Sequence, residues 1–204
     1  MGGPYHGPVR TTHLLYLHGF RSSPQSTKAR LVARRVATQC PELVWWCPQL
    51  SGEPDAAMDL VWHGVASWPR HSMAVIGSSL GGFYASLLAN RTGCKAVLLN
   101  PAAHPARDLR AHLGWQSQWH DPAQGFTLEP QCIAQLQALE QPGLLHPRQV
   151  LGIVAKGDEV LDWREMVAHL RGARLLLLEG GDHALSDFER HLDTVLEFLG
   201  LAPL

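Results

Sequence analysis

A serine between glycines lies near the middle of the chain, in the pattern G-x-S-x-G over residues 77–81. Residues 73–76 before it have the composition of a strand, and residues 83–90 after it have that of a helix. On such a strand–turn–helix junction a serine hydroxyl is exposed at the strand end, near the positive end of the helix. The spacing selects Ser79 as a candidate nucleophile, with Ser78 as its hydrogen-bonding neighbour. A chance Gly/Ser turn is the alternative, and the flanking strand and helix favour the nucleophile.

A base must accompany this serine, because a serine hydroxyl is a weak nucleophile near neutral pH. Among the twelve histidines, His183 lies in GGDHAL, after the last expected strand and before the last expected helix. In a doubly wound sheet that loop opens on the same edge as the serine turn. His183 is therefore the candidate base. His18, at the end of the first expected strand, is assigned a structural role, and most of the other histidines are expected to be solvated or packed.

An acid is also needed to orient the imidazole and to stabilise its charged form. Asp158 follows the fifth expected strand at its carboxyl end and is the preferred candidate. Asp162 stays open as the alternative, although an acid at the start of a helix usually caps it. Glu159 is a further rival, and so is Asp182, although neighbours in a tight loop, as Asp182 and His183 are, seldom face one another.

Acyl transfer further requires hydrogen-bond donors for the oxyanion that forms on the attacked carbonyl. The backbone N–H of Leu80, directly after the candidate nucleophile, is one predicted donor. The second is predicted in the loop over residues 18–23, where a His-Gly pair lets the backbone approach a substrate. Within that loop the N–H of Phe20 is the preferred donor.

Six strand-like runs alternate with helical patterns, which is typical of a parallel sheet covered by helices. The strands are expected over residues 14–17, 43–47, 73–76, 96–99, 150–155 and 174–178. The helices are expected over residues 26–39, 55–68, 83–90 and 163–170, with a last one ending near residue 199. The prediction is an α/β fold with a three-layer, doubly wound, mostly parallel sheet of about six strands.

Residues 101–147 interrupt this alternation. Ordinary connections run to about 2–8 residues, and a much longer one is usually functional. We interpret the segment as a lid insertion over the strand ends, with a helix of its own over residues 130–140. His104, Trp115 and Trp119 are candidate pocket residues: His104 lies within the expected lid, and tryptophans suit an acyl chain or an aromatic ester. The alternative is that the two tryptophans form the core of the lid itself. The whole chain, residues 1–204, is expected to form a single domain around this insertion.

The composition is that of a globular protein and excludes disorder, with 46% hydrophobic and 17% charged residues among 204. A net charge of −1 gives no broad attraction to nucleic acid or to an anionic membrane. The four scattered cysteines indicate no disulfide framework, and the histidines show no metal-ligand spacing. No apolar run is long enough for a bilayer, and the first residues lack a secretory signal. We therefore expect a cytoplasmic protein without a metal, a nucleic-acid partner or a membrane partner.

With these residues identified, the chain resembles the YqiA-type esterase family, also filed as UPF0227, within the α/β-hydrolase superfamily. The matching stretches lie in order along the chain: YLHGFRSSPQSTKA at 16–29, GSSLGGFYA at 77–85, NPA at 100–102, GDEVLDWRE at 157–165 and GGDHALSDFE at 180–189. The resemblance implies a compact hydrolase fold, carboxylesterase or acyl-CoA thioesterase activity, and no cofactor. It places the nucleophile, acid and base on Ser79, Asp158 and His183. Leu185 and Ser186 depart from the aromatic residue that family members tend to carry, which concerns the pocket lining.

These patterns predict a serine hydrolase that cleaves carboxylic esters through an acyl-enzyme on Ser79. An acyl-CoA thioesterase with the same three groups is the alternative. Arg107 and Arg110 are the weak candidates for contacts to the CoA phosphates, and both are expected to be solvated. A non-catalytic binding protein on a hydrolase scaffold is a third hypothesis. It is disfavoured because such proteins usually lose one of the three catalytic groups, and all three candidates are present here.

Overall fold

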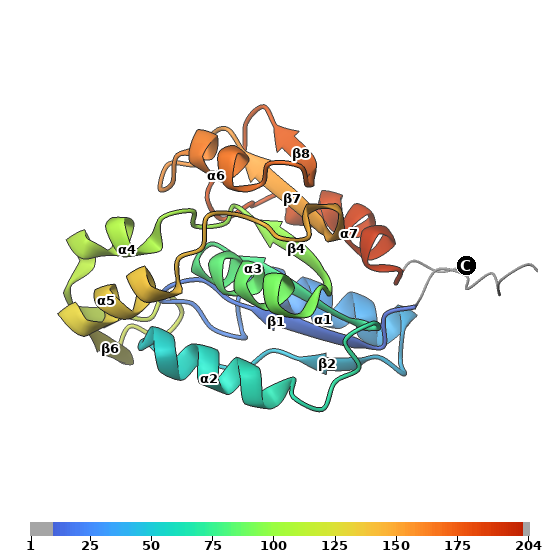
Figure 1. Ribbon diagram of the computed structural model, residues 1–204, viewed down its shortest axis with the longest axis horizontal. Helices are drawn as coiled ribbons and strands as arrows, with labels where there is room; N and C mark the ends of the chain where they lie inside the picture. Colours follow the sequence, from blue (N-terminus) through green and yellow to red (C-terminus); the bar gives the residue numbers. More distant parts are fainter. Residues whose placement is uncertain (1–9, 202–204) are drawn as a thin grey trace, which may run out of the picture.

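Six parallel strands form the central sheet of the computed structural model, which describes residues 10–201 (Figure 1). In spatial order they are β2 (Val44–Trp46), β1 (His13–Leu17), β3 (Met73–Ser78), β4 (Lys95–Leu99), β7 (Val150–Ala155) and β8 (Arg174–Leu178). Every neighbouring pair in this sheet is parallel. The predicted six-stranded sheet is therefore confirmed. The first nine residues, which make up most of the segment expected to lack a secretory signal, lie outside the described residues.

The chain reverses its direction of travel across the sheet between β1 and β3. It first moves outward from β1 to β2, and then returns to place β3 on the other side of β1. The loops after β1 and β3 therefore diverge to opposite faces of the sheet and leave a crevice at its carboxyl edge. This switch point is where a doubly wound sheet binds its ligands.

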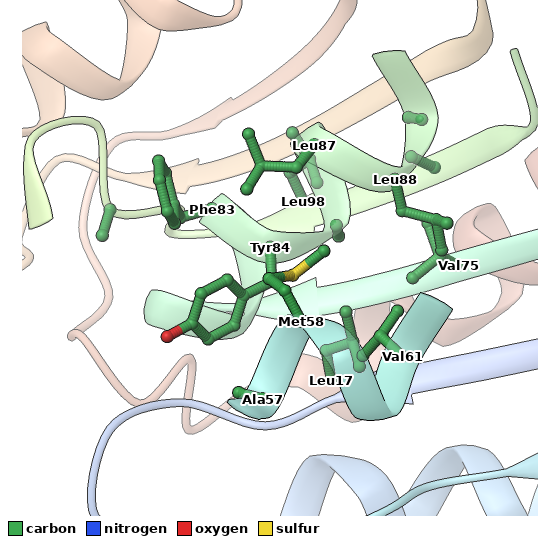
Figure 2. Packing of buried hydrophobic residues seen from close by; sticks show 14 of the residues in the cluster. Leu17, Ala57, Met58, Val61, Val75, Phe83, Tyr84, Leu87, Leu88 and Leu98 are labelled. Carbon is green, nitrogen blue, oxygen red and sulfur yellow. The ribbon is translucent and has the colours of Figure 1, made fainter. Parts of the chain in front are cut away.

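The four central strands are apolar because helices cover both of their faces. One face packs against α2 (Pro54–Gly64), α3 (Leu80–Thr92) and α6 (Trp163–His169), as Figure 2 shows for α2 and α3. The other face packs against α1 (Thr27–Gln39) and α7 (Leu192–Leu199), with the short turn η3 (Phe188–His191) before α7. These two cores give the predicted three layers.

Local sequence explains where two of these helices begin and end. In α1 the buried residues Ala29, Val32 and Val36 recur every three or four positions, and Ser26 caps the helix. Helix α3 is longer than predicted, because it begins directly at the serine turn. It ends where Gly93 adopts the left-handed conformation that favours glycine.

Helix α2 is shorter than predicted, ending at Gly64 instead of continuing to residue 68. The ring of Trp46 lies directly against Gly64, in space that a side chain there would need. The sequence pattern could not reveal this contact between a helix and an edge strand. Within residues 10–201, no helix has both the length and the apolar character needed to cross a bilayer.

The segment between β4 and β7 contains the predicted helix and a hairpin that was not predicted. Its elements are α4 (Pro105–Asp108), η1 (Leu109–His112), β5 (Gly114–Ser117), β6 (Gly125–Leu128), α5 (Pro130–Leu139) and η2 (Pro147–Gln149). Strands β5 and β6 form their own two-stranded antiparallel sheet. Four-residue strands that mix glycine with polar residues give too little alternation to be recognised in the sequence. In Figure 1, α4, α5 and β6 gather at one end of the molecule.

Candidate active site

The backbone of Ser79 adopts a conformation that is rare outside glycine, with φ 55° and ψ −120°. Strand β3 turns there directly into α3, and a side chain at Gly77 or Gly81 would overlap neighbouring backbone. Two hydrogen bonds join this turn to the end of β4: Ser79 N–H donates to Leu99 O, and Ala102 N–H donates to Ser79 O, each at 3.0 Å. A strained conformation of this kind costs about 1–3 kcal/mol and persists only where its surroundings impose it.

The three predicted catalytic side chains form a continuous hydrogen-bonded series. The Nε2 atom of His183 lies 3.0 Å from Ser79 Oγ, and its Nδ1 atom lies 2.7 Å from Asp158 Oδ2. The Asp158 side chain is completely buried, and its other oxygen accepts the N–H groups of Val160 and Leu161 at 2.8 Å each. These contacts orient the carboxylate toward Nδ1, so that Nε2 is left to accept the serine proton.

Asp162, the alternative acid, has a different role. Its side chain caps α6 by accepting the N–H of Arg164 at 2.8 Å. An acid in this position satisfies one of the free N–H groups at the helix start. Of the two open candidates, Asp158 is therefore the one that the structure places against the imidazole.

The two remaining acidic candidates stabilise the loop that carries His183. Glu159 accepts the backbone N–H of His183 at 3.0 Å. Asp182 accepts both the N–H and the hydroxyl of Ser186, and these hydrogen bonds hold the pKa of Asp182 below its usual value. Both carboxylates thus contact the loop backbone or its neighbours and leave the ring of His183 to Asp158.

His18 supports the loop that follows β1, which agrees with the structural role expected of it. Its ring is buried, and the N–H of Leu50 donates to Nε2 at 3.0 Å. Nδ1 therefore carries the proton, which it donates to Gly19 O at 2.9 Å. Burial lowers the pKa of His18, so the ring stays neutral and keeps this pattern of hydrogen bonds.

The two predicted oxyanion donors, Phe20 and Leu80, both line the cavity at Ser79. Within residues 10–201, neither backbone N–H donates a hydrogen bond to another protein group. Leu80 begins α3, so its N–H is one of the unpaired groups at the positive end of a helix. The loop of Phe20 is close to the serine, since a Cβ at Gly19 would lie 3.2 Å from Ser79 Cβ.

The cavity at Ser79 measures about 450 Å³, a size that suits a small molecule. Of the three predicted pocket residues, Trp119 lines it. His104 and Trp115 do not, and this part of the prediction is corrected. His104 precedes α4 and lines a separate surface hollow, and Trp115 on β5 is 63% exposed. The sequence revealed neither the strand that carries Trp115 nor the short helix that begins directly after His104.

The departure from the family pattern at Leu185 and Ser186 also falls away from this cavity. Leu185 is buried in the core beneath α1 and α7, where it has a φ of 49°. Ser186 bonds to Asp182. The residue of this loop that lines the cavity beside His183 is Ala184.

Asn100 is a positioning residue that the spacing analysis did not identify. It is 1% exposed at the end of β4, with a φ of 40°. Its Nδ2 donates to Asp182 O at 3.0 Å and to His183 O at 3.2 Å, and its Oδ1 accepts the N–H of Ala155 at 2.9 Å. The side chain thereby ties the His183 loop to the ends of β4 and β7. Its only signal in the sequence was the NPA motif at 100–102.

Arg21 connects the loop after β1 to the inserted hairpin, and it carries no distinctive signal in the sequence. Its Nε donates to Ser117 O at 2.6 Å and its guanidinium to Ser117 Oγ at 3.0 Å. The guanidinium carbon also lies 4.1 Å from the ring centroid of Trp119, whose backbone N–H donates to Arg21 O. Residue 21 thus joins the two sides of the cavity.

Metal-binding clusters are absent from the part of the chain that the structure describes. Within residues 10–201, no set of three or more His, Cys, Asp or Glu side chains is arranged to bind a metal ion. The four cysteines all lie in this range and are free thiols, three buried and one half-buried.

A family model described as an uncharacterised protein family, UPF0227, matches residues 13–200 of the chain. A UPF0227 protein of Vibrio parahaemolyticus is 24% identical over 125 residues, which cover 61% of this chain and 63% of that protein. The chain therefore spans less than two thirds of the length of that relative.

Several solved structures resemble the chain closely in fold. Mouse α/β hydrolase domain-containing protein 10 has a TM-score of 0.70 and 14% identity, over 94% of this chain and 92% of the other. Est1E from Butyrivibrio proteoclasticus, solved with ferulic acid bound, has a TM-score of 0.65 and 16% identity, over 97% and 90%. The esterase domain of a Rhodothermus marinus protein has a TM-score of 0.64 and 17% identity, over 94% and 86%. Likeness at these identities shows a shared α/β-hydrolase fold.

Proposed function

Because this chain belongs to UPF0227, an uncharacterised protein family, we infer its function from the geometry of its own site and propose that it is a serine hydrolase of small carboxylic esters. The family resemblance drawn from the sequence motifs is confirmed by the match over residues 13–200. The observation that carries the proposal is the hydrogen-bonded series from Ser79 through His183 to Asp158. The free N–H groups of Phe20 and Leu80 beside it support an acyl-transfer reaction.

The proposed reaction has two stages. Ser79 Oγ attacks the ester carbonyl while His183 Nε2 takes the serine proton, and the buried carboxylate of Asp158 stabilises the imidazolium. The oxyanion accepts hydrogen bonds from the two backbone N–H groups, and His183 then gives its proton to the departing alcohol. In the second stage His183 takes a proton from water as the water oxygen attacks the acyl carbon. The bond from that carbon to Ser79 Oγ then breaks, the carboxylic acid leaves, and His183 returns the proton to Ser79 Oγ.

Residues 101–147 are proposed to act as the lid of a single domain. Pro105, Leu109 and Trp119 of this segment line the same cavity as Ser79. Such a cover would limit the water that reaches the acyl-enzyme and would give apolar parts of a substrate a surface to contact. The segment is therefore expected to select substrates, while the sheet edge carries the reaction.

An oxygen ester is favoured over an acyl-CoA thioester as the substrate. The phosphates of CoA need cations to bind them, and the two candidates, Arg107 and Arg110, line a separate surface hollow instead of the cavity at Ser79. Arg107, one of the two candidates, already forms a two-pronged ion pair with Glu165 at 2.7 and 2.6 Å, and it also bonds to Asp108. Comparing turnover of butyryl-CoA and of 4-nitrophenyl butyrate tests this preference, and we expect a higher kcat/KM for the oxygen ester.

The proposal is tested by labelling and turnover of the purified chain. We expect a fluorophosphonate probe to label Ser79, and 4-nitrophenyl butyrate to be hydrolysed. In Ser79→Ala both signals should be lost, with turnover falling by about 10⁶-fold. Ser67→Ala is the matched control, because Ser67 is exposed and outside the cavity. Ester turnover that survives in Ser79→Ala would refute the assignment.

A further inference from the structure

One wall of the cavity at Ser79 is polar and has no role in the proposed reaction. It is formed by Tyr16 of β1, Ser26 and Lys28 at the start of α1, and Ser78 of β3. Tyr16 belongs to the core beneath α1 and α7, so this wall lies on that face of the sheet. Most of the remaining lining is apolar, with Phe20, Leu80, Leu109, Val160 and Leu161 among its members. Its other charged members are Arg21, which is bonded to Ser117, and Asp108, which is paired with Arg107.

The hydroxyl of Tyr16 is buried without a partner. The residue is 0% exposed, and although the hydroxyls of Ser26 and Ser78 lie close to its Oη, no group within residues 10–201 meets it in good hydrogen-bond geometry. Burial raises the pKa of Tyr16, so the phenol is neutral and can donate a proton. Leaving a buried hydroxyl unpaired is unfavourable, and such a group in a cavity wall indicates a ligand that supplies the acceptor.

Lys28 places a positive charge at the same wall. Its ammonium group donates one hydrogen bond, to the carbonyl of Ala184, directly after His183. Its other two N–H groups have no acceptor among the described residues. Burial lowers the pKa of Lys28 to about 8, against the opposing effect of the Asp182 and Asp158 carboxylates. The side chain is therefore mainly charged at neutral pH, although it is partly removed from water.

The hydroxyls of Ser26 and Ser78, which line the same cavity, can complete a set of donors with Lys28 and Tyr16. Ser26 Oγ accepts the N–H of Ala29 and keeps its own proton to donate, and Ser78 lies next to the nucleophile in the chain. An ammonium with a phenol and two hydroxyls is a set that matches the oxygens of an anion.

We propose that Tyr16, Ser26, Lys28 and Ser78 form a subsite for a carboxylate of the substrate, so that the preferred substrates are esters that carry a free acid near the scissile bond. This inference rests on the proposed function, because it describes what the same cavity selects. The carboxylate would displace water and accept hydrogen bonds from Lys28 Nζ and Tyr16 Oη. A half-ester of a short dicarboxylic acid is the simplest compound of this class.

Binding to the inactive chain tests the subsite without turnover. Monomethyl glutarate, an anion, and dimethyl glutarate, its neutral counterpart, are titrated by NMR into the Ser79→Ala protein. We expect the dissociation constant of the half-ester to be about 10-fold lower or more, because hydrogen bonds to charged groups are the stronger ones. In Ser79→Ala with Lys28→Met this preference should vanish. Equal dissociation constants for the two compounds would overturn the subsite and leave the proposed hydrolase untouched.

Turnover by the active chain tests whether the enzyme prefers an ester with a free carboxylate over a neutral ester. The ratio of kcat/KM for 4-nitrophenyl hydrogen glutarate to that for 4-nitrophenyl butyrate is measured in the wild type, Lys28→Met and Tyr16→Phe. We expect the ratio to fall about 10- to 100-fold in Lys28→Met and about 3- to 10-fold in Tyr16→Phe. Arg30→Met is the control, because Arg30 is exposed on the same helix and outside the cavity. It should leave the ratio unchanged.

A purely structural role for Lys28, holding the carbonyl of Ala184, predicts a different result. Turnover of both esters would then fall by the same factor in Lys28→Met, and the ratio would stay constant. A constant ratio in both Lys28→Met and Tyr16→Phe overturns the proposal. Because Tyr16→Phe removes only an unpaired hydroxyl, this variant should fold at least as stably as the wild type, and it keeps the test valid if Lys28→Met folds poorly.

Discussion

The serine turn and the inserted hairpin border the same cavity, yet they are held in place in different ways. The turn is part of the main sheet: Ser79 is bonded to the end of β4 and followed by the buried helix α3. The hairpin β5–β6 pairs only with itself, and Arg21 is its main polar link to the oxyanion loop. The difference indicates that the sheet determines the geometry of the reaction, while a less constrained segment shapes the space for the substrate.

The largest expected effect concerns the acid at the sheet edge. Asp158→Asn should lower kcat for a 4-nitrophenyl ester by about 10⁴-fold, because an amide in that position no longer favours the productive tautomer of His183. Stopped-time assays at high enzyme concentration measure the residual rate. Asp162→Asn is the matched change: an asparagine still caps α6, so kcat should stay within about twofold. Equal losses in the two variants would contradict the assignment of Asp158.

Alanine substitutions at two buried asparagines, one at the sheet edge and one at the insertion, compare the two regions directly. Asn100→Ala should destabilise the chain by about 2–4 kcal/mol and lower kcat about 10- to 100-fold, because the His183 loop loses its tie to β4. Asn90 is also buried and bonds to Gln141, Gly143 and Leu145 at the end of the insertion. Asn90→Ala should cost similar stability in urea unfolding and leave kcat nearly unchanged. A matching fall in kcat would show that the two regions are not separate in function.

The charge on the polar wall should respond to pH. The depressed pKa of Lys28, about 8, means that its charge is present below pH 8 and is lost as the pH rises above it. The preference for 4-nitrophenyl hydrogen glutarate over the butyrate should therefore fall by up to about 10-fold between about pH 7 and pH 9.5. A carboxylate stays ionised over this range, so the substrate contributes no change. A preference that rises or stays flat would exclude Lys28 as its source.

The link between the two regions should affect binding more than catalysis. Arg21→Met removes the hydrogen bonds to Ser117 and the contact with Trp119, which frees the hairpin. We expect KM to rise about 5- to 10-fold, while kcat changes by less than about twofold. Steady-state kinetics over a range of ester chain lengths measure both parameters. If turnover instead fell by two orders of magnitude, Arg21 would belong to the oxyanion machinery.

The smallest expected effects separate two tryptophans of the insertion. Trp119 lines the cavity, so Trp119→Ala should raise KM about threefold. Trp115 is exposed on the hairpin and outside the cavity lining, so Trp115→Ala should leave KM unchanged within error. The same ester panel serves for both variants. An effect of Trp115→Ala larger than that of Trp119→Ala would show that the hairpin turns its other face to the substrate.

The sheet edge could be predicted well from the sequence because its signals are local. An apolar strand followed by a glycine-flanked serine and a helix indicates one geometry, and parallel strands bring their carboxyl ends together. Candidates for the base and the acid could therefore be found at strand ends, and the structure places His183 and Asp158 in contact. The sequence already favoured Asp158 over Asp162, and the structure places Asp158 against the imidazole and Asp162 at the start of α6.

The residues that were missed act through contacts between distant parts of the chain. A single asparagine such as Asn100 has no spacing that distinguishes it from any loop residue, and its role arises when three strand ends meet. Arg21 likewise gains its partner 96 residues later in the chain. His104 and Trp115 were misplaced because the direction of each side chain depends on local structure that the sequence did not reveal: His104 stands directly before the short helix α4, and Trp115 lies on strand β5.

The connection between β4 and β7 has an evolutionary consequence. These strands pair directly, so the 101–147 segment leaves and re-enters the sheet between adjacent neighbours. Lengthening or replacing such an excursion breaks no strand pair, and the entropy of loop closure grows only slowly with length. The hairpin β5–β6 is therefore the part suited to exchange, by natural insertion and deletion or by grafting in the laboratory, whereas α5 contributes Cys132, Ile133 and Leu136 to the buried core and has to be kept. Such an exchange changes the surface that contacts the substrate and leaves the three side chains at the sheet edge in place.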